Sequence, residues 1–147
     1  MTYDITKRRA LETADVLLNE GDGTPLRDDD GKQLSITLCG PASKQWQQAD
    51  AERNRRQLQR AEKSPRKVAA AIAEGKREDD NHFLTNITVS FNGWEYPHPN
   101  KEDGGAWGSQ REMFKACYED GGFAFIRDQA LKEGEEHTAF TKGSQSS

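Results

Sequence analysis

The residue types that most often carry out chemistry in proteins are few and scattered in this chain. The three histidines, His82, His98 and His137, have no second histidine or cysteine at the spacing of a zinc site. Residues 28–31, Asp-Asp-Asp-Gly, begin like a calcium loop, but the twelfth position of an EF-hand requires a glutamate and is Cys39 here. The glycine patterns of phosphate loops and nucleophile elbows do not occur. We therefore expect no metal, no cofactor and no catalytic site.

The two cysteines, Cys39 and Cys117, lie far apart in the sequence, one on a strand-like pattern and the other on a helical pattern. No signal-peptide pattern occurs at the N-terminus, and no apolar stretch approaches the roughly 20 residues that a membrane-spanning helix needs. Because disulfides persist mainly in oxidising compartments, we expect two buried free thiols in a reducing cytosol.

Charge is segregated along the chain more than its net value of −4 suggests. The range 52–67 holds seven cations against two carboxylates, and the range 12–30 holds seven carboxylates against one arginine. The basic run could contact a phosphate backbone. No aromatic residues interleave its arginines, so we favour the alternative that it faces the acidic segment or an acidic partner and is otherwise solvated. Its cations are Arg53, Arg55, Arg56, Arg60, Lys63, Arg66 and Lys67.

A strand and a long helix in the middle of the chain must position these charges. Residues 34–39 alternate apolar and polar, which is the period of a half-buried strand. Gly40-Pro41 ends that strand, and nothing breaks a helix from Ser43 until Ser64, a length of about 30 Å.

This long helix has only two large apolar residues, Trp46 and Leu58, and they lie roughly 120° apart around its axis. It therefore cannot bury a broad apolar stripe within its own domain. Two interpretations stay open. We favour a solvated helix that is held at its Trp46 end, and the alternative is a helix that packs on another protein chain.

The N-terminal part of the chain predicts a small antiparallel sheet of two or three strands. Residues 1–12 form a polar lead-in that is compatible with a short helix over 7–13, and residues 15–19 form a candidate strand. Turn signals follow at 21–25 and at Asp30-Gly31, the second of hairpin type. Such a sheet is only marginally stable alone, so the apolar face of the middle strand needs a helix against it.

The segment from Phe83 to Trp94 is the most apolar part of the chain and fits two periods. Phe83, Ile87, Phe91 and Trp94 have helical spacing. Ile87, Val89 and Phe91 also alternate as in a strand, and β-branched residues favour that state. We favour the helix, and we expect the segment to lie in the core in either case.

Helix signals flank this apolar segment. Ser64-Pro65 predicts the start of a helix, and the charged range 76–80 predicts a break in it. After a glycine-rich loop, the range 109–112 forms a capping box. A last helix is expected over 123–132, with Gly134 at its end.

Together these elements predict an α+β fold with one domain over residues 1–140. A small N-terminal antiparallel sheet of two or three strands is followed by four or five helices, and residues 141–147 form a disordered tail. Only 33% of the residues are hydrophobic and 31% are charged, and the mean hydropathy is −1.01. This composition predicts a thin core and exposed helices.

Three stretches of the chain resemble the tail assembly chaperones of tailed phages and prophages. The first, 35–56, is the strand that ends in Gly-Pro with the Arg-Asn-Arg-Arg run that follows it. The second, 83–96, is the apolar segment that closes on Asn-Gly-Trp. The third, 113–129, begins with Met-Phe and contains the closing Phe-Ala-Phe-Ile helix.

The resemblance implies a non-enzymatic assembly factor without a cofactor. Such chaperones bind the tail tube protein and the tape measure protein, prevent premature polymerisation during tail morphogenesis, act in the host bacterial cytoplasm and are absent from the mature virion. We expect no membrane partner, and self-association stays open. The alternative function is a small nucleic-acid-binding regulator that uses the basic helix over 52–67. The candidate partner-binding residues are Trp46, Arg53, Arg56, Phe123, Ile126 and Phe140.

Overall fold

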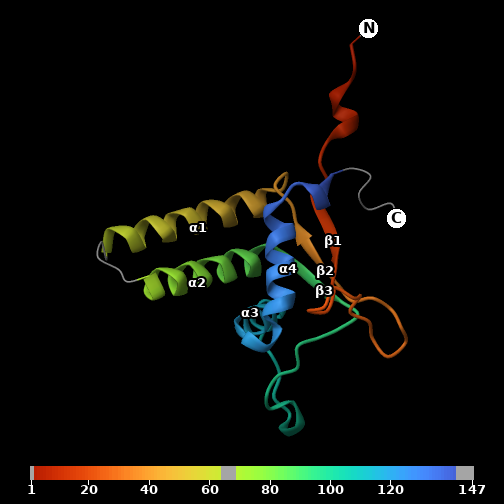
Figure 1. Cartoon of the computed structure of the whole chain (residues 1–147), viewed down its shortest axis with the longest axis vertical. Coiled ribbons are helices and arrows are strands. Elements are labelled where there is room, and N and C mark those ends of the chain that lie inside the picture. The colour runs from red at the N-terminus through yellow and green to blue at the C-terminus, as the bar shows by residue number, and fades with distance from the viewer. Residues whose placement is uncertain (1, 64–68, 142–147) are drawn as a thin grey trace.

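The computed structural model describes residues 2–63 and 69–141, which form a three-stranded antiparallel sheet, four α-helices and four short 3-10 turns (Figure 1). This confirms the predicted α+β class. The predicted helix start at Ser64-Pro65 and residues 142–147 of the predicted tail lie outside the described residues. The strands are β1 (Thr13–Leu17), β2 (Ser35–Cys39) and β3 (Thr88–Asn92), and the helices are α1 (Lys44–Lys63), α2 (Ala69–Ile87), α3 (Gln110–Glu119) and α4 (Ala124–Glu135).

β2 is the central strand of the sheet and pairs antiparallel with both neighbours, in the order β1-β2-β3. Ile36 lies between Val16 on β1 and Phe91 on β3, so apolar side chains of all three strands share one face. Ile36 and Leu38 are fully buried, as their alternation with polar residues predicts. The sheet is not wholly N-terminal, however, because its third strand follows α1 and α2 in the chain.

The segment from Phe83 to Trp94 is a helix in its first part and a strand in its second, so the favoured prediction of a single helix is wrong. Phe83 and Ile87 belong to α2 and are fully buried. The β-branched Thr88 begins β3, and its hydroxyl donates to the Leu84 carbonyl at 2.7 Å. Both periods in the sequence are therefore real, and each holds for one part of the segment.

α1 and α2 lie side by side and project from the sheet (Figure 1). We call residues 50–63 of α1 and 69–80 of α2 the helical arm. α2 is continuous through the predicted break near Asp80, which is buried there instead of solvated. The large apolar side chains of the arm, Leu58 and Ile72, are exposed.

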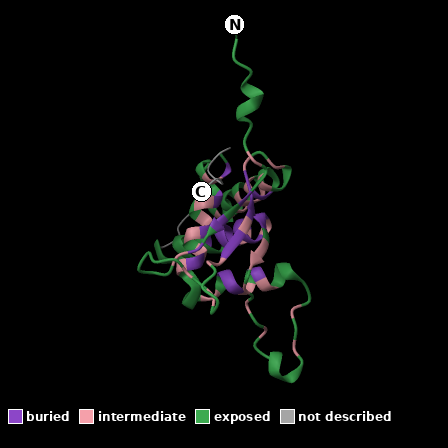
Figure 2. Cartoon of the chain, turned by 90° about the vertical axis from the view of Figure 1, so that its right-hand side faces the viewer, coloured by how far each residue is buried: buried purple, intermediate pink, exposed green. Residues whose placement is uncertain are grey.

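The apolar core lies where α2, α3 and α4 meet the sheet (Figure 2). A Cβ at Gly134 would lie only 2.7 Å from Cδ1 of Ile87, so glycine permits the close approach of α4 to α2. Gly134 lies within α4 and does not end it as predicted. A Cβ at Gly40 would overlap the Phe140 ring, which closes the core beside β1.

Both turn signals predicted between β1 and β2 are used, and three leucines organise them. The Leu18 N–H donates to the Leu34 carbonyl (2.9 Å), and the Leu26 N–H donates to the Leu18 carbonyl (3.0 Å). The Leu34 N–H donates to the Leu26 carbonyl (2.8 Å), which closes a triangle of backbone hydrogen bonds. Each turn contains a glycine in the left-handed region, Gly23 (φ +92°) and Gly31 (φ +83°), where other residues are strained.

Candidate functional site

Three of the six predicted partner-binding residues pack against the core, two of them buried and one half-buried. The Trp46 indole N–H donates to the Gly134 carbonyl (2.8 Å), and the Trp46 ring meets the Phe83 ring edge-on at 5.7 Å. Ile126 and Phe140 are buried, at 3% and 0% exposure. These side chains hold α1, α4 and the C-terminal turn in place; Ile126 and Phe140 offer no surface to a partner, whereas Trp46 is half-buried.

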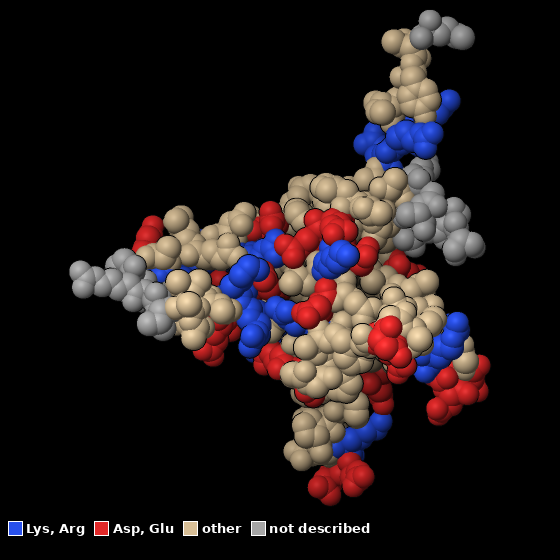
Figure 3. Space-filling view, viewed as in Figure 1, with Lys and Arg blue, Asp and Glu red and all other residues tan. Residues whose placement is uncertain are grey.

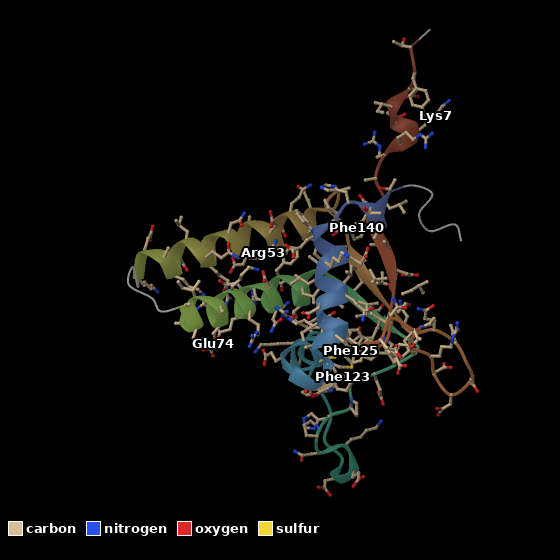
Figure 4. All side chains as sticks on the ribbon, viewed as in Figure 1. Lys7, Arg53, Glu74, Phe123, Phe125 and Phe140 are labelled. Atoms are coloured by element: carbon tan, nitrogen blue, oxygen red, sulfur yellow. The ribbon has the colours of Figure 1, made fainter. Side chains whose placement is uncertain are left out.

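Arg53, another predicted contact residue, also points inward (Figure 4). Its side chain is 11% exposed, and its guanidinium carbon lies 3.9 Å from the centroid of the Phe83 ring, which is a cation–π contact. Three carboxylates surround the guanidinium, those of Asp50 (3.1 Å), Asp80 (3.2 Å) and Glu135 (3.4 Å). Arg53 therefore connects α1 to α2 and α4.

Asp79 is a fully buried carboxylate that joins the two helices of the arm. Its Oδ1 accepts from Nε of Arg56 at 3.0 Å, and its Oδ2 accepts from Nε of Arg60 at 3.0 Å. Arg60 also contacts Glu78 at 2.8 Å. A buried carboxylate needs such charge-assisted donors, because desolvation is costly when they are missing.

The basic run thus finds its acidic partners on α2 and α4, and not in the acidic segment between β1 and β2. Arg55 pairs with Glu52 at 2.6 Å on the surface of α1. Each arginine of the run within residues 52–63 is therefore already paired, and Figure 3 shows cationic and anionic side chains interleaved over this face. Binding to a phosphate backbone would have to compete with these carboxylates.

An open groove of about 520 Å³ lies between the end of β3, the loop that follows it and the start of α3. We call it the aromatic groove. A concave site of this size, lined by aromatic rings together with polar side chains, is typical of places where proteins bind ligands or partner side chains. Its main lining residues are Phe91, Trp94, Tyr96, His98, Trp107 and Met113.

Hydrogen bonds inside the protein fix the polar atoms of these rings. The Trp94 indole N–H donates to the Ser35 carbonyl (2.9 Å), and the Trp107 indole N–H donates to the Tyr96 carbonyl (2.7 Å). The Tyr96 hydroxyl donates to Oδ2 of Asp120 (2.7 Å), which lowers the pKa of Asp120 and raises the pKa of Tyr96. With these polar atoms satisfied, the rings line the groove as apolar surface.

The rings also support one another. Phe91 and Trp94 are stacked with centroids 3.9 Å apart, and Tyr96 and Trp107 are stacked at 6.0 Å. The His98 ring meets Trp107 at 4.7 Å in a T-shaped contact. Such pairs hold large side chains in place, so contact area is offered at a low entropic cost.

The loop that carries these rings is anchored at its end by the predicted capping box. The Ser109 hydroxyl accepts from the Glu112 N–H (3.3 Å), which confirms that α3 begins here. The Glu112 carboxylate accepts from the Gly108 N–H (2.8 Å), one residue before the usual donor. A Cβ at Gly105 would lie 2.7 Å from Nδ1 of His98, so this tight loop requires a glycine there.

Phe123 is the predicted apolar contact residue that stays on the surface, at 38% exposure. Its ring meets the Tyr96 ring edge-on at 5.8 Å, so it lies beside the aromatic groove at the start of α4 (Figure 4). The predicted last helix begins one residue later than expected, at Ala124.

Sequence reasoning treated the loop after Trp94 as a plain connection and missed the groove residues Tyr96 and Trp107. A signal was present, because two of the chain's three tryptophans lie within a short polar segment rich in glycine and proline. Large aromatic residues in such a segment need either a core or a partner to cover them.

Cys39 and Cys117 are both free and buried, as predicted. Burial, with a smaller contribution from the Asp120 carboxylate, raises the pKa of Cys117 to about 12. Burial likewise raises the pKa of Cys39. Both thiols are therefore protonated at neutral pH, whereas the thiolate is the nucleophilic form.

Comparison with known proteins gives no match: no family model, no curated protein and no solved structure matches this chain. Within residues 2–63 and 69–141, no helix is long and apolar enough to cross a bilayer. The same residues contain no group of three histidine, cysteine, aspartate or glutamate side chains placed to hold a metal ion.

Proposed function

We propose that this protein is a tail assembly chaperone and that it holds an apolar segment of a phage tail protein in the aromatic groove. The client is the tail tube protein or the tape measure protein, which is kept from polymerising until assembly begins. The chaperone acts by binding alone, in the cytoplasm of the infected bacterium, and does not remain in the virion.

The aromatic groove is the observation that carries this proposal. Tryptophan and tyrosine are the residues that most often dominate binding energy at interfaces, and exposed apolar patches mark interaction sites. The groove rings are held by hydrogen bonds and stacking before a client arrives, so binding orders few side chains. At the rim, Lys101 and Glu95 pair at 2.6 Å and neutralise each other beside the apolar lining.

The sequence resemblance supports the class of client. Two of the three resembling stretches supply walls of the groove: 83–96 contributes Phe91 and Trp94, and 113–129 contributes Met113. The residues that resemble tail assembly chaperones are therefore partly the residues that line the candidate site.

The direct test is the polymerisation of the tail tube protein encoded by the same genome. Light scattering of the monomeric tube protein is followed with and without an equimolar amount of chaperone, which should delay polymerisation. Trp107→Ala should weaken client binding by about 2 kcal/mol, or roughly 30-fold, because it removes a central aromatic contact. Leu58→Ala is the matched control, since it removes an exposed apolar side chain from the arm.

Two results would count against the proposal. Tube polymerisation at an unchanged rate, together with no binding of the tape measure protein, would overturn the chaperone function. A delay that Trp107→Ala leaves intact, and that Leu58→Ala abolishes, would move the binding site from the groove to the arm.

A further inference from the structure

Residues 2–10 form an extended N-terminal arm that leads into β1 and projects away from the body of the protein (Figure 1). It contains a 3-10 turn over Ile5–Arg8, and a helix over 7–13 does not form because β1 begins at Thr13. The hydrogen bonds of the turn are local: Asp4 accepts from Thr6, and Arg8 donates to the Tyr3 hydroxyl. The arm is thus ordered by itself and offers its side chains outward.

The side chains of the N-terminal arm are those of a docking segment. Tyr3 and Ile5 are 62% and 72% exposed, although they are large and apolar. Lys7, Arg8 and Arg9 follow them, and none of these cations pairs with a carboxylate in the described part of the chain. Figure 3 shows them as a separate cationic cluster.

The complementary surface lies at the other end of β1, where residues 18–34 form what we call the acidic twin turn. The triangle of leucine backbone bonds divides it into two eight-residue units with a shared pattern: leucine, one residue, an acidic residue, one residue, then Asp-Gly. The acidic pair is Glu20 and Asp22 in the first unit and Asp28 and Asp30 in the second. The repeated fold therefore presents carboxylates on two neighbouring turns.

These carboxylates are not neutralised within the described residues. With Asp29, the twin turn holds five carboxylates and only two cations, Arg27 and Lys32. None of these seven side chains forms an ion pair with another described residue. The Arg27 guanidinium donates to the Gly31 carbonyl instead. Thr24 donates its hydroxyl and N–H to Asp22 and lowers the pKa of that carboxyl, which stays ionised. Beside the twin turn, Leu17 at the end of β1 is 56% exposed.

From these two surfaces we propose that the N-terminal arm of one copy docks on the acidic twin turn of a second copy. Cations meet unneutralised carboxylates, and Tyr3 and Ile5 meet the exposed Leu17. The N-terminal arm precedes β1 and the twin turn follows it, so the two surfaces of one chain lie at opposite ends of the strand. The contact joins two different surfaces, so one contact per copy builds a head-to-tail ring or filament, and two reciprocal contacts between two copies close a dimer.

The assembly is held largely by surface charges, so it is salt-sensitive. Sedimentation velocity of the full chain should show concentration-dependent oligomers at low ionic strength that dissociate to monomers at about 0.5 M salt. Reversing the charge of the N-terminal arm, with Lys7→Glu, Arg8→Glu and Arg9→Glu, should lower the association constant at least tenfold. Reversing the twin turn, with Glu20→Lys, Asp29→Lys and Asp30→Lys, should do the same, and it leaves the turn-forming Asp22 and Asp28 in place.

The decisive measurement mixes the two reversed variants. Each should be monomeric alone, and an equimolar mixture should form oligomers again, because each restores the charge complement of the other. A control with Lys44→Glu, Lys63→Glu and Lys132→Glu carries the same change in net charge elsewhere and should still assemble. Circular dichroism shows that every variant is folded.

Three outcomes would overturn the proposal. They are a wild-type protein that is monomeric at all concentrations, a mixture of reversed variants that stays monomeric, and an arm that binds the tail tube protein while the chaperone itself remains a monomer. The first two outcomes leave the aromatic groove untouched, so they separate self-association from the proposed chaperone function.

Discussion

α2 belongs to two regions of the molecule that are held together by different forces. In its C-terminal part, Phe83 and Ile87 are fully buried in the apolar core with the sheet, α3 and α4. In the helical arm, the buried side chains that face α1 are the carboxylates of Asp79 and Asp80, which form ion pairs with arginines. A single helix therefore joins an apolar core to an arm whose two helices are joined by ion pairs.

The difference has consequences for stability. Burial of a large apolar side chain contributes roughly 1.5–3 kcal/mol. A buried ion pair loses much of its Coulombic gain to desolvation, so its net contribution is small, although removal of one partner is costly. Ion pairs thus determine the geometry of the helical arm but stabilise it less than apolar packing stabilises the core. We expect the helical arm to unfold locally before the core does.

Phe83→Ala tests the core half of this comparison and should have the largest effect. The ring is fully buried and supports both Trp46 and Arg53, so its removal should lower the free energy of unfolding by about 3–5 kcal/mol. Urea denaturation measures this loss. Phe123→Ala, at a 38% exposed position, is the control and should cost about 1 kcal/mol or less. Equal losses for the two variants would contradict the assignment of the core.

Asp79→Asn tests the arm and should have the second largest effect. It removes the charge that two guanidinium groups share, and we expect a loss of about 1.5–3 kcal/mol. Arg56 and Arg60 remain about one-third exposed, so water can solvate them afterwards, which limits the loss. Hydrogen exchange should speed up in the arm, 50–63 and 69–80, and stay slow in β2 and β3.

Glu78→Gln is the matched control for this arm variant. Its side chain is 58% exposed, and its pair with Arg60 should contribute well under about 1 kcal/mol. If Asp79→Asn and Glu78→Gln have the same small effect, the buried ion pair does not hold the arm together.

Sequence reasoning predicted the apolar region better than the charged one, and the reason is physical. The alternation of Ile36 and Leu38 and the capping box at Ser109 are local patterns, and both formed as expected. Asp79 was assigned to a solvated break because charged runs are usually solvated. Its partner Arg56 lies 23 residues away, and no local period indicates that pairing.

The aromatic groove could be predicted only in part. Phe91 and Trp94 were recognised as apolar positions, but the change from helix to strand between Ile87 and Thr88 decides where they point. Trp107 reaches the groove through a loop whose shape depends on tight glycine positions, and loop shape does not follow from residue spacing. The residues of the site were therefore visible in the sequence, but their convergence was not.

The pH dependence of stability should come from the charged region, with a smaller effect than that of Asp79→Asn. Burial, followed by the guanidinium groups of Arg56 and Arg111, lowers the pKa of His82 below its usual 6.5, although Glu52 and Asp79 act in the opposite direction. The unfolded chain then binds more protons between the lowered pKa and 6.5, so the free energy of unfolding falls as the pH drops through that window.

His82→Gln isolates this contribution. It should flatten the slope of stability against pH below 6.5, as measured by urea denaturation at several pH values. A variant that keeps the wild-type slope would show that His82 is not the source of the pH dependence.

The smallest effect is expected from the apolar side chains of the arm, and it completes the comparison. Leu58 and Ile72 are 62% and 55% exposed, so Leu58→Gln with Ile72→Gln should change the free energy of unfolding by no more than about 0.5 kcal/mol. If apolar packing between α1 and α2 held the helical arm together, replacing these two residues would be costly. Thermal and urea unfolding at low protein concentration provide the measurement. A loss above about 1 kcal/mol would mean that these side chains are covered in solution, and the arm would then be stabilised like the core and not by its ion pairs.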